Sequence, residues 1–380
     1  MGKARAAWQT WFTQRLASHD MRQQIPLGNR MVGAGCRPFT IAEVGINHNG
    51  DFARACSMID AAKAAGADAV KFQTFKAAEF CGDPQQTFTY QSQGVSVTES
   101  MLAMFQRYEF DRETWFRLKA YCDTIGMMFL STPQNVGDLE LLLEIGIDAV
   151  KIGSDDFTNL PLIRRYAETG LPLILSCGMS DIADVHQALE SAGWFDGHPV
   201  VLMLCTSQYP TPPQDVNVRK ITTLRQAFEG LVVGFSDHTQ GPLAASLAVA
   251  LGASVFEKHF TLSHDLPGPD HWFSEEPVGL QQWIEAIQAA HVMLGSAWVR
   301  PTGAELEMRV LARRSVIVLR DIAPGEALTA ENVGLRRPGN GLPPVFLEQV
   351  LGLAATRHLH AGQRLTLGDM QRVARTEEPA

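Results

Sequence analysis

Lysine and hydroxyl side chains recur at the ends of short apolar runs in this chain. Lys71, Lys151 and Lys258 occupy such positions, and so do Thr132, Ser154, Ser176 and Ser236. Ammonium groups and hydroxyl donors gathered in one place can bind a phosphate or a carboxylate. Taken singly, such a lysine is commonly a solvated surface group, and such a serine caps the next helix. Taken together, they predict an anion-binding site in a chain with a formal net charge of −9.

Two histidines end consecutive apolar runs and could share a metal ion. His238 and His259 would then lie on adjacent strands. Two neutral imidazoles completed by water suit a catalytic divalent cation with open coordination positions. In the alternative, His238 orients a loop and His259 is hydrogen-bonded in the core, with no metal. Glu43 ends another run and would act as a general base on a metal-bound water, or pair with one of the lysines.

These residues belong to a unit that repeats from residue 40 onward. Each unit has an apolar run, a polar or glycine break and a stretch of helical periodicity. Strands that are apolar on both faces and alternate with helices predict a parallel sheet, and eight such units predict a closed (β/α)8 TIM barrel. A doubly wound open sheet is the structural alternative. The expected strands are 40–43, 69–73, 127–131, 149–152, 173–176, 200–205, 232–236 and 255–259. Ligands of such a barrel bind at the carboxyl ends of its strands.

Further segments surround the expected barrel. Residues 25–32 predict a hairpin that could close the bottom of the barrel, and the long connection 74–111 predicts a lid or a substrate-contacting excursion. We expect an appendage at 1–20, the barrel with its hairpin at 21–294, a linker at 295–312 and a small β-rich domain at 313–380.

Composition excludes several classes of protein. The chain has 46% hydrophobic and 19% charged residues, so it can bury a sizeable core, and no run approaches the roughly 20 apolar residues of a membrane span. The net charge argues against a nucleic-acid partner. The 6 cysteines are scattered without a Cys-x-x-Cys pair, which indicates a reducing, cytoplasmic compartment.

An ordered set of motifs resembles the sialic acid (N-acetylneuraminate) synthase family. The motifs are Ile41-Ala42-Glu43-Val44-Gly45-Ile46-Asn47-His48-Asn49-Gly50, Val70-Lys71-Phe72-Gln73-Thr74, Ser131-Thr132-Pro133, Lys151-Ile152-Gly153-Ser154, Ser176-Cys177-Gly178-Met179, Cys205-Thr206-Ser207, Gly234-Phe235-Ser236-Asp237-His238-Thr239, Glu257-Lys258-His259-Phe260 and Gly268-Pro269-Asp270-His271. The segment Arg336-Arg337-Pro338-Gly339-Asn340-Gly341 is similar to the antifreeze-like (SAF) domain that ends these synthases. The resemblance spans about residues 25–370.

The resemblance implies a role for each matching residue. Glu43, Lys71, Lys151, His238 and His259 would be catalytic, and His238 and His259 would hold Mn²⁺, with Mg²⁺ or Co²⁺ as alternatives. Phosphoenolpyruvate would be held by Lys71, Thr132, Lys151, Ser154, Ser176 and Ser236. The sugar side would involve Gln73, Asp156, Ser207, Tyr209 and Asp270, while Lys258 belongs to the lysine set. Arg337 would reach the sugar's N-acetyl group from the neighbouring subunit of a domain-swapped homodimer. Departures from the family pattern at Asp155-Asp156, Ser207 and Cys177 put the identity of the sugar in question more than the reaction.

The implied reaction condenses phosphoenolpyruvate with N-acetylmannosamine or a close analogue to give N-acetylneuraminate and phosphate. Synthesis of legionaminate or pseudaminate from a diacetamido-trideoxyhexose is the alternative within the family. Two alternatives lie outside it: a barrel aldolase that forms a Schiff base on a lysine, and a carbohydrate-binding protein without catalysis.

Overall fold

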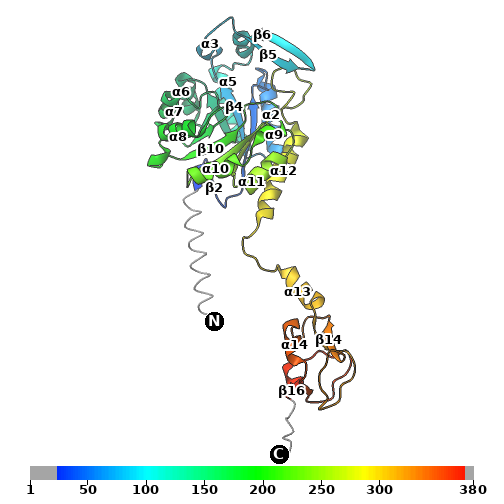
Figure 1. Ribbon diagram of the computed structural model, residues 1–380. Coiled ribbons are helices and arrows are strands. Elements are labelled where there is room, and N and C mark those ends of the chain that lie inside the picture. The colour runs from blue at the N-terminus through cyan, green and yellow to red at the C-terminus, as the bar shows by residue number, and fades with distance from the viewer. Residues whose placement is uncertain (1–23, 373–380) are drawn as a thin grey trace, which may run out of the picture. The chain divides into compact units, whose positions relative to one another are not determined.

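The described residues divide into two compact units, with the boundary between Gly295 and Ser296. The computed structural model describes residues 24–372 (Figure 1). The expected appendage at 1–20 lies outside the described residues. Along the described chain, no helix is long and apolar enough to cross a membrane.

The first unit is built on an eight-stranded sheet in which every paired neighbour is parallel. Its order is β7-β4-β3-β12-β11-β10-β9-β8, and the end strands β7 and β8 also lie side by side. The strands therefore follow one another around a nearly closed ring. This order confirms the barrel and excludes the doubly wound sheet. The strands are β3 (Phe39–Gly45), β4 (Ala69–Thr74), β7 (Met128–Pro133), β8 (Val150–Ile152), β9 (Leu173–Ser176), β10 (Val200–Cys205), β11 (Val232–Asp237) and β12 (Val255–His259).

Helices follow these strands, and several of them begin and end at residues that favour helix termini. Asp51 and Asp181 cap two of them by accepting backbone N–H groups, and Gly126 and Gly146 end two others in the left-handed conformation. The helices are α2 (Phe52–Ala64), α5 (Arg112–Ile125), α6 (Val136–Ile145), α7 (Leu160–Ala167), α8 (Ile182–Ser191), α9 (Pro213–Val216), α10 (Lys220–Ala227), α11 (Leu243–Ala250) and α12 (Pro277–Leu294), with a 3₁₀ turn η2 (Trp194–Asp196).

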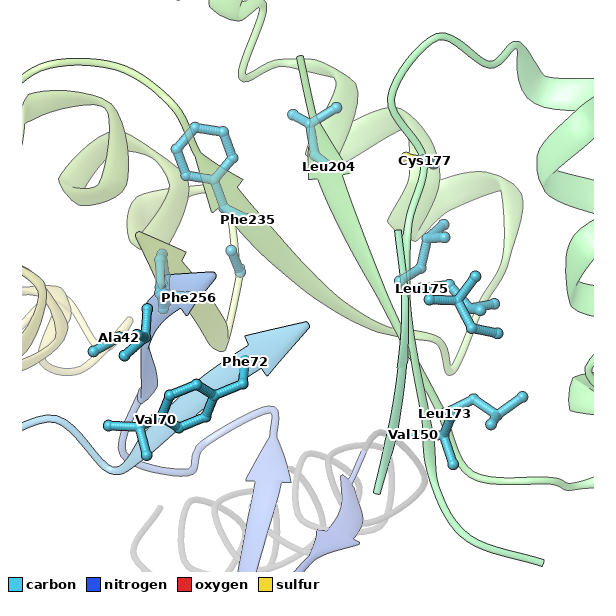
Figure 2. Close-up of a cluster of buried hydrophobic side chains, with 14 of the residues drawn as sticks. Ala42, Val70, Phe72, Val150, Leu173, Leu175, Cys177, Leu204, Phe235 and Phe256 are labelled. Carbon is cyan, nitrogen blue, oxygen red and sulfur yellow. The ribbon is translucent and has the colours of Figure 1, made fainter. Parts of the chain in front are cut away.

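Alternate residues of the barrel strands enter two different cores. One set, which includes Phe72, Leu175 and Phe256, packs outward against the helices (Figure 2). The other set points into the barrel and shares a buried cluster with Leu27 and Val32. These two residues belong to the hairpin of β1 (Gln24–Leu27) and β2 (Arg30–Gly33), which therefore packs into the barrel interior, as its sequence predicts.

The long connection after β4 has structure of its own. It contains α3 (Ala77–Phe80), the antiparallel strands β5 (Thr87–Ser92) and β6 (Val95–Ser100), and α4 (Met101–Gln106). The turn between the strands is tied to the segment after β12, because Gln93 donates to the Asp265 carbonyl and the Gly268 N–H donates to Ser92. This attachment positions the excursion beside the loop that follows β12.

The second unit is small, with short antiparallel pairs around its own core. Val316, Ile322, Leu328, Leu359 and Leu365 are buried in that core. Its elements are α13 (Gly303–Ala312), β13 (Ser315–Val318), β14 (Val333–Arg336), η3 (Pro344–Phe346), α14 (Leu347–Val350), β15 (Ala354–Ala355), η4 (Leu367–Asp369) and β16 (Met370–Gln371). The segment 295–312, expected as a linker, thus contains a helix.

Candidate active site

The chemistry-bearing side chains reach one cavity because strand residues alternate between two faces. In β4, Val70 and Phe72 pack outward, so Lys71 and Gln73 point inward. The same alternation places Glu257 and His259 of β12 inside the barrel. The cavity has a volume of about 330 Å³ and lies at the carboxyl ends of the strands.

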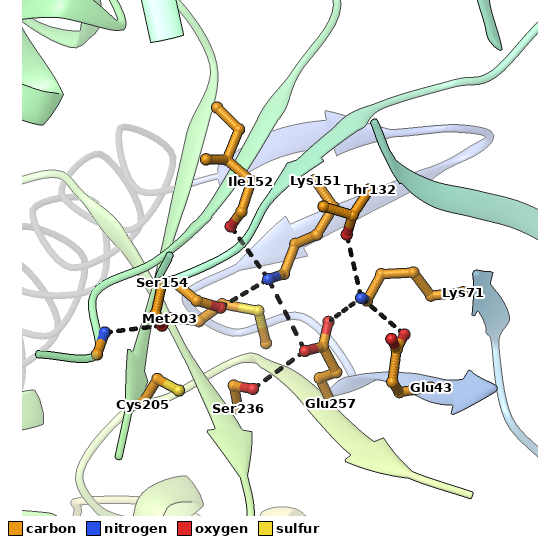
Figure 3. Close-up of polar contacts among 12 residues, drawn as sticks. Glu43, Lys71, Thr132, Lys151, Ile152, Ser154, Met203, Cys205, Ser236 and Glu257 are labelled. Atoms are coloured by element: carbon orange, nitrogen blue, oxygen red, sulfur yellow. Dashed lines mark hydrogen bonds and ion pairs between the residues drawn. The ribbon is translucent and has the colours of Figure 1, made fainter. Parts of the chain in front are cut away.

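Two lysines and two glutamates form a buried cluster at the base of this cavity (Figure 3). The Lys71 Nζ lies 2.7 Å from the Glu43 Oε2 and 3.7 Å from the Glu257 Oε2, and it donates to the Thr132 hydroxyl over 3.3 Å. The Lys151 Nζ lies 3.8 Å from the Glu257 Oε1. Glu257 therefore lies between the two ammonium groups.

Hydroxyl groups complete the surroundings of this cluster. Lys151 donates to Ser176 over 2.7 Å and to the Ile152 carbonyl over 3.2 Å. Ser236 donates to Glu257 over 3.0 Å. Because Lys151 and Lys71 are only 2% and 3% exposed, an anion that bound here would meet desolvated, preoriented donors.

Burial and the neighbouring charges shift the pKa values of this cluster in different directions. Burial would raise the pKa of Glu257, but Lys151 and Lys71 outweigh it and hold that pKa below its usual range. Burial raises the pKa of Glu43 to about 7, against the attraction of Lys71. Burial lowers the pKa of Lys151, whereas Glu257 and Glu43 overcome burial and raise the pKa of Lys71. Glu43 therefore has a pKa suited to proton transfer near neutral pH.

The two histidines meet at one side of the same cavity. The ring centroids of His238 and His259 are 5.4 Å apart. The His238 Nδ1 lies 2.8 Å from the Thr206 carbonyl, to which it must donate, so its Nε2 carries the lone pair and lies 3.4 Å from the Ser236 hydroxyl. The His259 Nδ1 is buried without a hydrogen-bond partner in the described chain, and burial holds the pKa of His259 well below its usual value. The two imidazoles are thus suited to donate to a divalent cation.

A second cavity of about 520 Å³ adjoins the first. Gln73, Ser207, Tyr209 and His259 line both. Asp270 lines the second cavity, with its Oδ2 4.0 Å from the His259 Nδ1. Aromatic side chains from β5 and from the segment after β12 form much of the remaining wall: Phe88, Tyr90, Trp272 and Phe273.

Most of the sequence-predicted site residues are brought together in these two cavities. The first cavity is lined by Glu43, Lys71, Gln73, Thr132, Lys151, Ser154, Ser176, Ser207, Tyr209, Ser236, His238 and His259, and Asp270 joins them through the second. Arg337 follows β14 in the second unit.

The structure places Lys258 and Asp156 differently from the expectation. Lys258 is buried on the opposite face of β12 from Glu257 and His259, with its Nζ 3.2 Å from the Asp237 Oδ2. It also donates to the Thr239 carbonyl, so it holds the end of β11 and the residues around His238, and it is not part of the cavity wall. Asp156 accepts a hydrogen bond from Asn159 at the start of α7, and its neighbour Asp155 lines the cavity instead.

The sequence-based selection missed Glu257, the residue between the lysines. The available signal was the period-two alternation of a strand, because an inward His259 requires an inward Glu257 and an outward Lys258. The aromatic wall of the second cavity was also missed, because it combines β5 with a loop more than 170 residues further along the chain.

Comparisons with known proteins agree with this geometry. The NeuB family model matches residues 58–298, and the SAF domain model matches residues 313–370. The chain is 38% identical over 337 residues to the N,N'-diacetyllegionaminic acid synthase of Legionella pneumophila, covering 88% of this chain and 94% of that protein. It is 33% identical over 336 residues to the pseudaminic acid synthase of Helicobacter pylori, covering 88% and 98%.

A solved structure, the N-acetylneuraminic acid synthetase of Leptospira borgpetersenii, is also similar. It superimposes with a TM-score of 0.68 at 33% identity, covering 75% of this chain and 95% of that one. The chain therefore belongs to the NeuB family of sugar-acid synthases and carries a SAF domain near its carboxyl end.

Proposed function

We propose that this protein condenses phosphoenolpyruvate with a diacetamido-trideoxyhexose to give a legionaminate-type sugar acid and phosphate. The observation that carries the proposal is one cavity with two buried lysines, bordered by two imidazoles and sharing four lining residues with a second, aromatic cavity. The first cavity suits a small ligand with a phosphate and a carboxylate, and the second suits a sugar with apolar substituents.

The lysine cluster would bind phosphoenolpyruvate and stabilise the charge that develops as its phosphate leaves. Lys71 and Lys151 would contact the anionic groups, and Thr132, Ser176 and Ser236 would add hydrogen bonds. In the reaction, C3 of phosphoenolpyruvate attacks the sugar aldehyde, water adds at C2, and phosphate departs by C–O cleavage. Donors that are already oriented stabilise such charge without reorganising.

His238 and His259 would hold a divalent cation such as Mn²⁺, which would supply Lewis acidity toward the aldehyde. The His259 Nδ1, which has no hydrogen-bond partner among the described residues, and the lone pair on the His238 Nε2 support this assignment. Glu43 would transfer a proton, as its raised pKa permits. Gln73, which donates to Glu43 over 3.2 Å, would orient that carboxyl group. Tyr209 and Asp270 would position the sugar beside it.

The comparisons favour a diacetamido sugar over N-acetylmannosamine, the main expectation from sequence. The legionaminic acid synthase is more similar in sequence than the N-acetylneuraminic acid synthetase of known structure. The aromatic wall supports the same choice, because a deoxy methyl group and a second acetamido methyl group gain more from aromatic contact than hydroxyl groups do.

A phosphate-release assay with a panel of sugars tests this choice. We expect kcat/KM for a diacetamido-trideoxyhexose to exceed that for N-acetylmannosamine at least tenfold, as expected for about 1–3 kcal/mol per apolar group recognised. Trp272→Ala should reduce that ratio, while Phe116→Ala, which changes an exposed aromatic side chain of α5 outside the cavities, should leave it unchanged. Equal activity with both sugars would contradict the sugar assignment but not the reaction.

Schiff-base chemistry is the enzymatic rival, because a lysine such as Lys151 with a lowered pKa can act as an amine nucleophile. Membership of a family of sugar-acid synthases favours the condensation instead. Borohydride trapping with a carbonyl substrate should therefore give no reduced adduct.

A cytoplasmic location is supported by the 6 cysteines, which are all free thiols in the structure.

We also propose a domain-swapped homodimer in which Arg337 of one chain completes the sugar site of the other. Arg337→Ala should then raise the KM for the sugar far more than the KM for phosphoenolpyruvate. Mixing Arg337→Ala with His238→Ala subunits should restore activity, because a heterodimer would contain about one intact site. If activity is not restored after confirmed subunit exchange, each second unit serves its own barrel.

A further inference from the structure

The second unit carries a cluster of metal-ligating side chains outside the cavities described above. Asp321, His358 and His360 each place one ligand atom within 4.8 Å of the other two, and all three side chains are exposed. The ring centroids of the two histidines are 4.5 Å apart, and the His360 Nδ1 lies 3.6 Å from the Asp321 Oδ2. Ligands of a tetrahedral zinc ion lie roughly 3.3 Å apart, so small side-chain rotations would bring these atoms onto one ion.

The backbone beneath this cluster is firmly held. Ile322 and Leu359 are fully buried and exchange both of their backbone hydrogen bonds, each 2.9 Å long. The histidines flank Leu359 in sequence, so alternation turns both imidazoles away from the core on which Leu359 packs. Asp321 directly precedes Ile322 on the paired segment. The three ligand groups are therefore presented side by side by a rigid frame.

The Asp321 carboxylate faces the His360 imidazole. Its Oδ1 accepts the Ala361 N–H over 2.8 Å, which orients the carboxylate and leaves the Oδ2 toward His360. The adjacent guanidinium of Arg320 pairs with Glu326 over 2.8 Å instead.

We propose that Asp321, His358 and His360 bind one borderline divalent cation of the Zn²⁺ type, with water in the open position. Two imidazoles and one carboxylate favour Zn²⁺ over Mg²⁺ or Ca²⁺, which prefer oxygen ligands alone. The ion would join the segment at 321 to the segment 358–360 and so stabilise the second unit.

Metal counting on the full chain tests the proposal. The protein, free of any affinity tag and stripped with chelator, is titrated with Zn²⁺ and weighed by native mass spectrometry. His358→Gln, His360→Gln and Asp321→Asn should each lose one tightly bound equivalent compared with the wild type, or bind it at least about tenfold more weakly. His186→Gln, at an exposed histidine of α8, is the matched control and should lose nothing.

A second measurement locates the ion. In the wild type, Zn²⁺ should protect both His358 and His360 from modification by diethyl pyrocarbonate. In each single variant, His358→Gln or His360→Gln, the histidine that remains should not be protected. Each variant is compared with the wild type, and both contain His238 and His259. The variant should therefore bind one Zn²⁺ fewer whether or not His238 and His259 also bind metal. Equal stoichiometry and affinity in all variants, or unprotected histidines in the wild type, would overturn the proposal. Thermal melting in chelator checks that the variants are folded.

Discussion

Replacing Lys151 by methionine is expected to reduce kcat/KM for phosphoenolpyruvate roughly 30- to 4,000-fold. In the proposed complex, the Lys151 ammonium group pairs with an anionic group of phosphoenolpyruvate. Removing one partner of such a buried, hydrogen-bonded charge pair costs about 2–5 kcal/mol, and each 1.4 kcal/mol corresponds to a tenfold change. Lys151 is 2% exposed and lines the first cavity, so its ammonium group is a largely desolvated donor there. The loss should appear mainly in phosphoenolpyruvate binding and in the chemical step.

Two controls make the Lys151 result specific. Ser176→Ala removes only the hydroxyl that accepts from Lys151, so its effect should be much smaller. Lys76→Met removes an ammonium group that pairs with Glu109 outside the cavity and should leave kcat/KM nearly unchanged. Steady-state kinetics with both substrates, together with thermal melting, separate loss of binding from loss of folding. An unchanged KM for phosphoenolpyruvate and an unchanged kcat in folded Lys151→Met would contradict the anion-site assignment.

Removing divalent metal is expected to abolish turnover, and adding Mn²⁺ is expected to restore it. The physical reason is that the proposed cation would be held by imidazole nitrogens of His238 and His259, which both line the first cavity. Phosphate release is measured before chelation, after chelation and after metal is added back. Full turnover in chelator-treated enzyme that elemental analysis shows to be metal-free would refute the metal requirement.

His259→Ala tests the same site by mutation. Activity should be lost while the melting temperature changes little, because a side chain at a strand end contributes more to chemistry than to packing. His186→Ala, at an exposed position of α8, should affect neither property. If His259→Ala unfolds the protein instead, the histidine serves the core, which is the alternative that its sequence position left open.

The sequence alone predicted the barrel architecture and most of the residues that prove to line the first cavity. Apolar runs alternating with helical stretches define the eight strands, and the rule that barrel ligands bind at strand carboxyl ends selects Lys71, Lys151, His238 and His259 without coordinates. This succeeds because strand periodicity and the order of elements are local properties of the chain. Family motifs narrowed the reaction further, and the comparisons confirmed the family.

Only the tertiary structure decided which face each strand residue occupies and which distant loops meet. The hydrophobic pattern of strands that are apolar on both faces does not show which face points inward, so Lys258 was assigned to the site and Glu257 was passed over. Alternation from His259 could have separated these two neighbours, but only once His259 was known to point inward. The aromatic second cavity depends on hydrogen bonds that tie Gln93 and Ser92 to the segment after β12. Such contacts join segments that are remote in sequence, and local periodicity does not encode them. They form only when the whole barrel has assembled and brought those segments together.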